Sequence, residues 1–324
     1  MHRTFLPPLL ACLPLALVAC GTPGAVGAAA PGQSLPEERA GRMRPVRIAS
    51  LGGGEGLCAL LDDYQADHPG HDILDLPGMQ RHEAGASPSV VFVQRGEGMA
   101  TMGTESSEVR VGDIALLRPG QALEVDGDLD AVAFVLPLDL PPDLPSFIRV
   151  DFDPSITDTP GGCATDPGAY RRVALTWLAS RGPYILHGFN AHRVRIDDSF
   201  THYHPVEGGF DEFYLVQEAP AGARLLTSTR LSRISDPSTE DPTTLPGLFD
   251  VHELEAGDLV YIPRGVAHRG LGGAVVHVLA VPGFRPGGEV GLDHVLHELN
   301  ELHGLGGEDA LPLHEAGARQ AVVK

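Results

Sequence analysis

Short apolar segments recur along most of the chain, and glycine and proline separate them at intervals of about ten residues. Within a segment, apolar residues either alternate with polar ones or run without interruption. These are the patterns of half-buried and fully buried strands. The segments with the clearest pattern are residues 90–94, 109–117, 131–136, 213–217, 258–262 and 275–281. The pattern predicts an all-β fold, built as an antiparallel sandwich or barrel.

Two segments have the spacing of helices instead. Residues 57–66 lie before the first group of strands, and residues 292–302 follow the last group. In the second segment, apolar side chains recur every three or four residues and so fall on one helical face. We expect this face to pack on a barrel wall; it comprises Leu292, Val295, Leu296, Leu299 and Leu302.

The strand pattern is repeated within the chain. Residues 112–123 align without a gap with residues 257–268, an offset of 145. The same offset relates 132–137 to 277–282, whereas 92–94 match 215–217 at an offset of 123. The 22-residue difference between the offsets predicts an insertion in the second copy, and we expect a polar surface loop over 232–248. The chain therefore consists of two related domains, for which we expect the boundaries 46–150 and 151–290, followed by a helix and tail over 291–324.

The N-terminus has the features of an export signal. Arg3 precedes an apolar run over residues 5–19, which contains three prolines and is too short for a typical membrane span. The run ends in Leu-Val-Ala-Cys at 17–20, which resembles the lipobox of bacterial lipoproteins. That resemblance implies removal of residues 1–19 and acylation of Cys20, with residues 20–45 as a flexible tether. An ordinary secretory signal, cut near residues 28–30, is the alternative.

Charge narrows the range of partners. The chain has 23 Lys and Arg against 43 Asp and Glu, a formal net charge of −20. Such a surface repels nucleic acids and anionic lipid headgroups, so we expect contact with a membrane through the lipid anchor only. The single lysine, Lys324, is the last residue, which argues against catalysis by a lysine.

Two cysteines, Cys58 and Cys163, lie beyond the predicted lipidation site. Export places them in an oxidising compartment, where a Cys58–Cys163 disulfide would persist. Two buried thiols are the alternative.

The second copy contains a candidate metal site. His202 and His204 are two residues apart, so in a strand both side chains project from the same face. Further on, the segment 257–268 reads Gly-x5-Pro-x-Gly-x2-His, in which Gly265 permits a tight turn before His268. Three imidazoles and one carboxylate suit a divalent ion such as Fe, Mn, Ni, Cu or Zn.

Three carboxylates follow the histidine pair, namely Glu207, Asp211 and Glu212. We choose Glu212 as the ligand because it begins the apolar segment that aligns with residues 90–94. The same strand face would then carry Tyr214, which becomes a candidate for contact with the substrate. His277 lies on a nearby strand and is a candidate to support the metal ligands from behind.

These motifs, His-x-His with a following Glu and then Gly-x5-Pro-x-Gly-x2-His, resemble the two signature motifs of the cupin superfamily. The second motif matches at every defined position, whereas the seven residues between His204 and Glu212 exceed the usual spacing. The resemblance implies two tandem cupin barrels, each a double-stranded β-helix or jelly roll, with a few short helices. It also implies that His202, His204, Glu212 and His268 bind one metal ion.

The first copy lacks most of this set. Leu123 stands at the position of His268 and Ser89 at that of Glu212, although His82 and Glu83 lie nearby. We therefore expect the first domain to be structural and to bind no metal.

The resemblance implies a metal-dependent enzyme acting on a small molecule, with a dioxygenase-like oxidoreductase as the leading reaction class. Glu212, and with less support Tyr214, would then act on protons of the substrate. A sugar isomerase or epimerase is a second enzymatic alternative. A lipid-tethered protein that binds a small molecule or a metal without catalysis is the alternative from another class.

Overall fold

A computed structural model of the chain describes residues 44–52, 56–235, 245 and 247–319. They belong to one compact unit, Arg39–Lys324. The predicted signal peptide and nearly all of the tether, including Cys20, lie outside the described residues. No helix in the described ranges is both long and apolar enough to cross a membrane.

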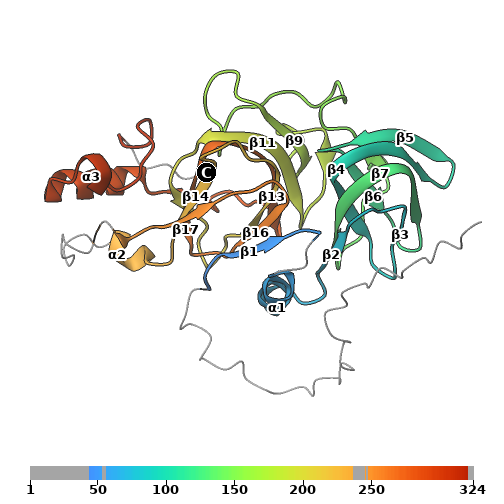
Figure 1. The fold of residues 1–324 in the computed structure, drawn as a ribbon, viewed down its shortest axis with the longest axis horizontal. Helices are drawn as coiled ribbons and strands as arrows, with labels where there is room; N and C mark the ends of the chain where they lie inside the picture. The colour runs from blue at the N-terminus through green and yellow to red at the C-terminus, as the bar shows by residue number, and fades with distance from the viewer. Residues whose placement is uncertain (1–43, 53–55, 236–244, 246, 320–324) are drawn as a thin grey trace, which may run out of the picture. The chain divides into compact units, whose positions relative to one another are not determined.

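The described chain is mostly β-structure, arranged in two sheets (Figure 1). The first sheet, here called the first barrel, has seven strands: β2 (Asp72–Leu76), β3 (Arg81–Glu83), β4 (Ser89–Met102), β5 (Glu105–Arg110), β6 (Ile114–Leu117), β7 (Ala122–Val135) and β8 (Phe147–Ile148). The second sheet, the second barrel, has eleven strands: β1 (Arg47–Ser50), β9 (Arg171–Thr176), β10 (Tyr184–Ile185), β11 (Asn190–Asp198), β12 (His202–Tyr203), β13 (Asp211–Glu218), β14 (Arg224–Ser228), β15 (Asp250–Glu253), β16 (Asp258–Ile262), β17 (Ala267–Val281) and β18 (Val290–Gly291). The predicted all-β fold with two β-domains is confirmed.

Strand register confirms the internal repeat. Ser89 pairs with Leu117 and Val135, and Glu212 pairs with Ile262 and Ala280. These pairs are related by the offsets of 123 and 145 found in the sequence. Ser89 therefore occupies in the first barrel the place that Glu212 occupies in the second.

Long strands allow each sheet to form two facing layers. In the second barrel, the C-terminal part of β17 pairs with β11 and β13, and its N-terminal part pairs with β12 and β14. Apolar side chains from both layers meet between them, among them Val194, Tyr214, Val216, Leu225 and Val276. The interior of the first barrel is filled in the same way by Val91, Val93, Leu117, Leu123 and Val125 with their neighbours.

A third group of buried apolar residues joins the two barrels. It combines Phe92 and Phe134 of the first barrel with Phe189 and Phe213 of the second. Two glutamines related by the repeat reinforce this contact reciprocally. Gln94 Nε2 donates to the carbonyl of Val216 at 2.5 Å, and Gln217 Nε2 donates to that of Val93 at 3.2 Å. The barrels therefore pack through equivalent faces, as two subunits related by a two-fold axis would.

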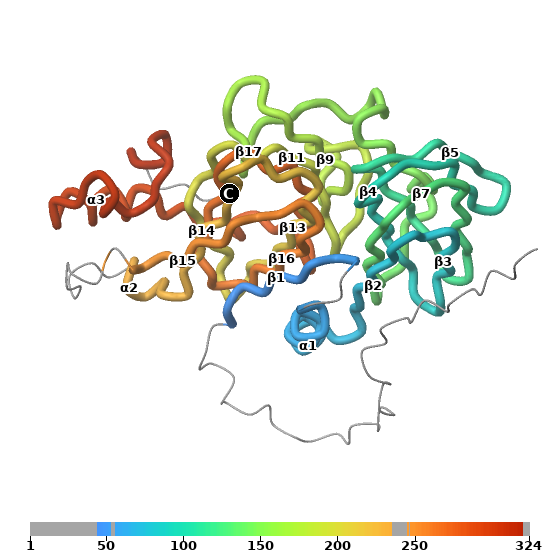
Figure 2. The backbone as a smooth tube through the Cα atoms, in the orientation of Figure 1, coloured from blue at the N-terminus to red at the C-terminus, as the bar shows by residue number. Residues whose placement is uncertain are grey.

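The expected boundary at residue 46 is wrong for one strand. β1 precedes the whole first barrel in the chain, yet it pairs antiparallel with β16 at the edge of the second barrel. Figure 2 shows β1 beside β16, with the helix α1 (Leu57–Asp67) following it. The chain then continues into the first barrel. An edge strand can be supplied by any segment that reaches the open edge, so sequence order does not determine its partner.

Both predicted helices are present, as α1 and as α3 (Asp293–His303). The apolar face of α3 is buried at Leu296 and Leu299, but Leu302 is 66% exposed and was assigned wrongly to that face. The helix packs mainly on the predicted insertion, which contains α2 (Leu231–Ser235) and buries Ile234, Leu245 and Leu248. The insertion is therefore not only a surface loop. A short 3-10 helix, η4 (Gly307–Asp309), follows α3.

Candidate metal centre

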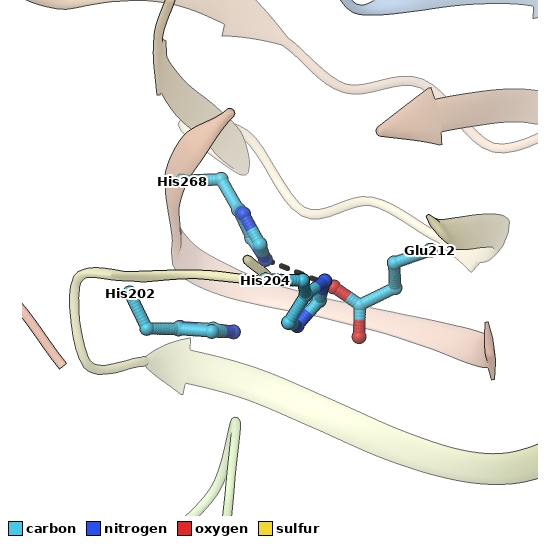
Figure 3. Close-up of side chains that lie close together, drawn as sticks. All are labelled: His202, His204, Glu212 and His268. Atoms are coloured by element: carbon cyan, nitrogen blue, oxygen red, sulfur yellow. Dashed lines mark hydrogen bonds and ion pairs between the residues drawn. The ribbon is translucent and has the colours of Figure 1, made fainter. Parts of the chain in front are cut away.

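The structure brings together the four predicted ligand residues. His202, His204, Glu212 and His268 are all buried, and one potential ligand atom from each lies within 4.8 Å of the others. Figure 3 shows the three imidazoles and the carboxylate converging on one region. We refer to these four residues as the His/Glu cluster.

Local backbone structure explains why the cluster forms. His202 on β12 pairs directly with His268 on β17, so the two side chains leave the sheet on the same side. The turn before β17 is closed by Gly265, which has φ 86° and donates its N–H to the carbonyl of His204 at 2.7 Å. That left-handed conformation favours glycine, which explains its position in the motif. The turn thus ties the two histidine motifs together.

Hydrogen bonds orient two of the rings. Nδ1 of His202 lies 3.0 Å from the carbonyl of Phe200, and Nδ1 of His268 lies 3.0 Å from that of Val266. Because a carbonyl only accepts, each Nδ1 carries the proton, which leaves the Nε2 lone pairs free to bind a cation.

The carboxylate adds a second indication that the site suits a cation. Nε2 of His268 lies 2.9 Å from Oε2 of Glu212. With the proton of His268 on Nδ1, both atoms would be acceptors, and a cation bound between them would satisfy both. Burial, and then the neighbouring His268, lower the pKa of both His202 and His204, which keeps their imidazoles neutral and able to bind a metal. The donor set therefore fits a divalent transition metal.

The other two carboxylates considered from the sequence are not in the cluster. Glu207 is exposed. Asp211 is buried, but it accepts hydrogen bonds from His68, from the hydroxyl of Tyr261 at 2.9 Å, and from the backbone N and Nε of Arg264 at 2.8 and 2.9 Å. These donors satisfy Asp211 on the face of β13 opposite to Glu212.

Tyr214 is fully buried in the interior of the second barrel, on the same face of β13 as Glu212. Burial, followed by the charge of Glu212, raises the pKa of its hydroxyl, which therefore remains protonated. The thiol of Cys163 contacts this hydroxyl.

His277 does not support the metal ligands as expected. The residues that pair with Glu212 and Tyr214 are Ala280 and Val278, so His277 lies on the opposite face of β17. Its Nε2 donates to the carbonyl of Gly112 in the first barrel at 3.0 Å, and its ring packs on Phe92. His277 belongs to the contact between the barrels.

The predicted Cys58–Cys163 disulfide does not form in the structure, in which Cys163 carries a buried thiol. The count of cysteines in an exported protein indicated that a disulfide was plausible, but only the fold determines which cysteines meet.

Sequence reasoning missed three polar residues near the cluster. His192 on β11 lies on the same face as Val194, in the barrel interior, and Arg171 on β9 pairs with Val194. Glu289 interacts electrostatically with His202, Tyr214 and Arg171. The alternation of His192 with Val194 and Ile196 was a signal for an inward-facing histidine, but nothing in the sequence placed Arg171 or Glu289.

The first barrel has no comparable set at the equivalent positions. His82 pairs with Leu123 as His202 pairs with His268, and Ser89 stands in place of Glu212. Among these residues only His82 offers a typical ligand for a transition metal.

No protein family model matches the chain, and no curated protein sequence matches it. Similar folds occur among solved structures. Oxalate decarboxylase from Bacillus subtilis has a TM-score of 0.46 and 12% identity, covering 87% of this chain and 85% of that one. Vicilin from Corylus avellana (hazelnut) has a TM-score of 0.44 and 11% identity, covering 74% and 80%. Procruciferin, an 11S globulin from Brassica napus, has a TM-score of 0.45 and 11% identity, covering 68% and 79%. The two all-β barrels with equivalent registers, and the His/Glu cluster in one of them, give this chain the double cupin fold that its motifs predicted.

Proposed function

We propose that the protein is a metal-dependent enzyme that acts on a small molecule inside the second barrel. The observation that carries this proposal is the buried His/Glu cluster, in which hydrogen bonds to backbone carbonyls aim two histidine Nε2 atoms at a shared point. A divalent transition metal held there would polarise a substrate oxygen as a Lewis acid.

The surroundings of the cluster favour catalysis over simple binding. Tyr214 supplies a protonated hydroxyl on the same face as Glu212, His192 supplies a neutral imidazole, and Glu289 supplies a carboxylate outside the cluster. Groups of this kind can orient a substrate and move protons during a reaction. The interior of the first barrel consists mainly of apolar side chains, so polarity is not a general property of these barrels.

Among reaction classes, we propose a dioxygenase-like oxidation as the first to test, because three imidazoles and one carboxylate leave open positions on an ion that prefers five or six ligands. We also propose that the protein is exported and anchored to the cell envelope by a lipid on Cys20. The support for this is the lipobox-like sequence at residues 17–20.

The experiment that tests the enzymatic proposal begins with purification without chelators and without oxygen, followed by elemental analysis. The metal-loaded protein is then screened for oxygen uptake with a panel of small organic substrates, beside a His268→Ala variant. We expect bound metal, and oxygen uptake that is lost in the variant. Metal binding without turnover across the panel, including assays for isomerisation, would favour a binding protein instead. Protein without metal would refute the enzymatic proposal.

A further inference from the structure

Arg171 is a cation inside the second barrel without an anionic partner at contact distance. It pairs with Val194 across β9 and β11, and so shares the face that lines the barrel interior. Its Nη1 donates to the carbonyl of Thr159 at 3.0 Å, and its Nε is buried without a hydrogen-bond partner. Within the described ranges it forms no ion pair with a carboxylate.

Three other arginines on strands of this barrel are paired with carboxylates. Arg172, the next residue on β9, points to the opposite face and binds Asp151 and Asp158 at 3.0 and 3.1 Å. Arg193 binds Asp151 at 2.7 Å, and Arg269 binds Asp198 at 2.5 Å. Arg171 is partly exposed, but its Nε is buried and unpaired, and a largely enclosed charge without a partner is unfavourable.

Arg171 also faces the same interior as the candidate metal centre. Its partner Val194 belongs to one buried cluster with Tyr214, which lies on the face of β13 that carries Glu212. Arg171 interacts electrostatically with Cys163 and, beyond ion-pair distance, with Glu289 and Glu212. Gly161 and Gly162 lie over the guanidinium: a Cβ at either position would be 3.8 Å from its nitrogen atoms. The backbone at these two glycines therefore lies next to the guanidinium.

His192 provides a second polar atom without a partner. It lies on the same face of β11 as Val194, and its Nε2 is buried without a hydrogen-bond partner. Burial, and then the charge of Arg171, lower the pKa of His192 and keep its ring neutral. An arginine fork and a neighbouring imidazole that can donate a hydrogen bond form a suitable site for a planar carboxylate.

We propose that Arg171 binds a carboxylate group of the substrate, assisted by His192, so that the substrate is a small organic acid whose other end reaches the His/Glu cluster. That the bound acid is a substrate rests on the proposed function, whereas binding of an anion by Arg171 does not require catalysis.

The test compares malonate with malonamide, which has the same skeleton but no charge, by isothermal titration calorimetry. Both are titrated into Mn²⁺-loaded and into metal-free protein. A charge-assisted pair of this kind corresponds to about a 10- to 100-fold difference in affinity. We therefore expect malonate to bind at least about tenfold more tightly than malonamide in both forms of the protein.

Substitutions test whether the preference for malonate over malonamide depends on Arg171. Arg171→Gln should abolish it, and Arg171→Lys should retain part of it because the charge remains while the planar fork is lost. Arg195→Gln, at a half-exposed arginine that pairs with Glu218 at the surface, removes the same charge and should leave the preference unchanged. Metal content should be the same in all variants.

Two results would overturn the proposal. One is equal binding of malonate and malonamide by the wild type, which needs no variant to fold. The other is a preference that survives Arg171→Gln, or that exists only with metal bound, since the metal alone would then bind the anion. Failure of the proposed function gives a different result: no metal is retained, or no turnover is found, while the malonate preference of the metal-free protein still reports on Arg171.

Discussion

Asp211 and Glu212 are adjacent carboxylates near the candidate metal centre, but their hydrogen-bond partners lie on opposite faces of β13. Asp211 is held by donors on one side of β13, whereas its neighbour Glu212 faces His268 on the other. Adjacent residues of a strand project to opposite faces, so one carboxylate stabilises the packing of α1 while the next is available to a metal.

This difference predicts which residues bind the metal. Replacing any one member of the His/Glu cluster by alanine should abolish metal retention, because the three remaining groups do not complete the ligand set. The wild type should hold about one ion per chain, as measured by elemental analysis after gel filtration. Glu207→Ala, at an exposed carboxylate, and His82→Ala, in the first barrel, are the controls and should retain the metal. A content near two ions per chain would show that the first barrel binds metal as well.

A second prediction at this scale concerns His277. Burial, and then the charge of Arg193, lower the pKa of His277 to about 3, against an ordinary value of 6.5. As the pH falls below 6.5, the unfolded chain takes up a proton that the folded protein does not, so the stabilising contribution present above that pH is lost progressively towards pH 3. At pH 5 the loss from this residue is about 2 kcal/mol.

Urea unfolding at pH 7 and pH 5 measures this effect. His277→Gln cannot titrate, but it can still donate to Gly112, so its free energy of unfolding should decrease less than that of the wild type over this range. His297→Gln, at a side chain that is 44% exposed, should behave like the wild type. Identical pH dependence in wild type and His277→Gln would contradict the assignment.

At the scale of elements, only part of the predicted apolar face of α3 is buried. Leu296 and Leu299 are buried against α2 and the insertion, but the last turn of the helix extends beyond this contact. Leu296→Ala should therefore lower the free energy of unfolding by about 2–5 kcal/mol, whereas Leu302→Ala should change it by less than about 0.5 kcal/mol. Equal effects of the two substitutions in urea unfolding would show that α3 does not pack in this way.

At the scale of the whole molecule, the two barrels share one apolar core. The rings of Phe92 and Phe134 contact those of Phe189 and Phe213 across the barrel contact, with centroid distances of 5.4–6.2 Å. β1 adds a covalent constraint, because it belongs to the second sheet but leads into the first barrel.

We therefore expect both barrels to unfold in a single calorimetric transition. Phe134→Ala should destabilise this transition by about 3–5 kcal/mol, and Phe152→Ala, at a ring that is 50% exposed, by less than about 1 kcal/mol. Two well-separated transitions in the wild type would mean that the shared core does not couple the barrels.

Localisation is tested on the whole chain. Cys20→Ala removes the thiol that the lipobox resemblance predicts to be acylated, so the variant should leave the membrane fraction. Mass spectrometry of the wild type should find an acylated N-terminal Cys20. An unmodified wild type starting near residues 28–30 would support an ordinary secretory signal instead.

The sequence by itself determined the features that depend on short spacings. The period of two in strands placed His202 and His204 on one face, and placed Glu212 with Tyr214. The repeat with offsets of 123 and 145 determined the double fold, and identified Ser89 and Leu123 as substitutes for the metal ligands.

Only the tertiary structure decided which distant segments meet. β1 pairs with β16 across the whole first barrel, His277 faces the other barrel, and Arg171 faces the interior of its own. Residue spacing determines the side of a strand from which a side chain projects, but not which surface that side will cover. The covered surface depends on packing between segments more than one hundred residues apart, such as those of His277 and Gly112. Local spacing does not determine which of these segments meet.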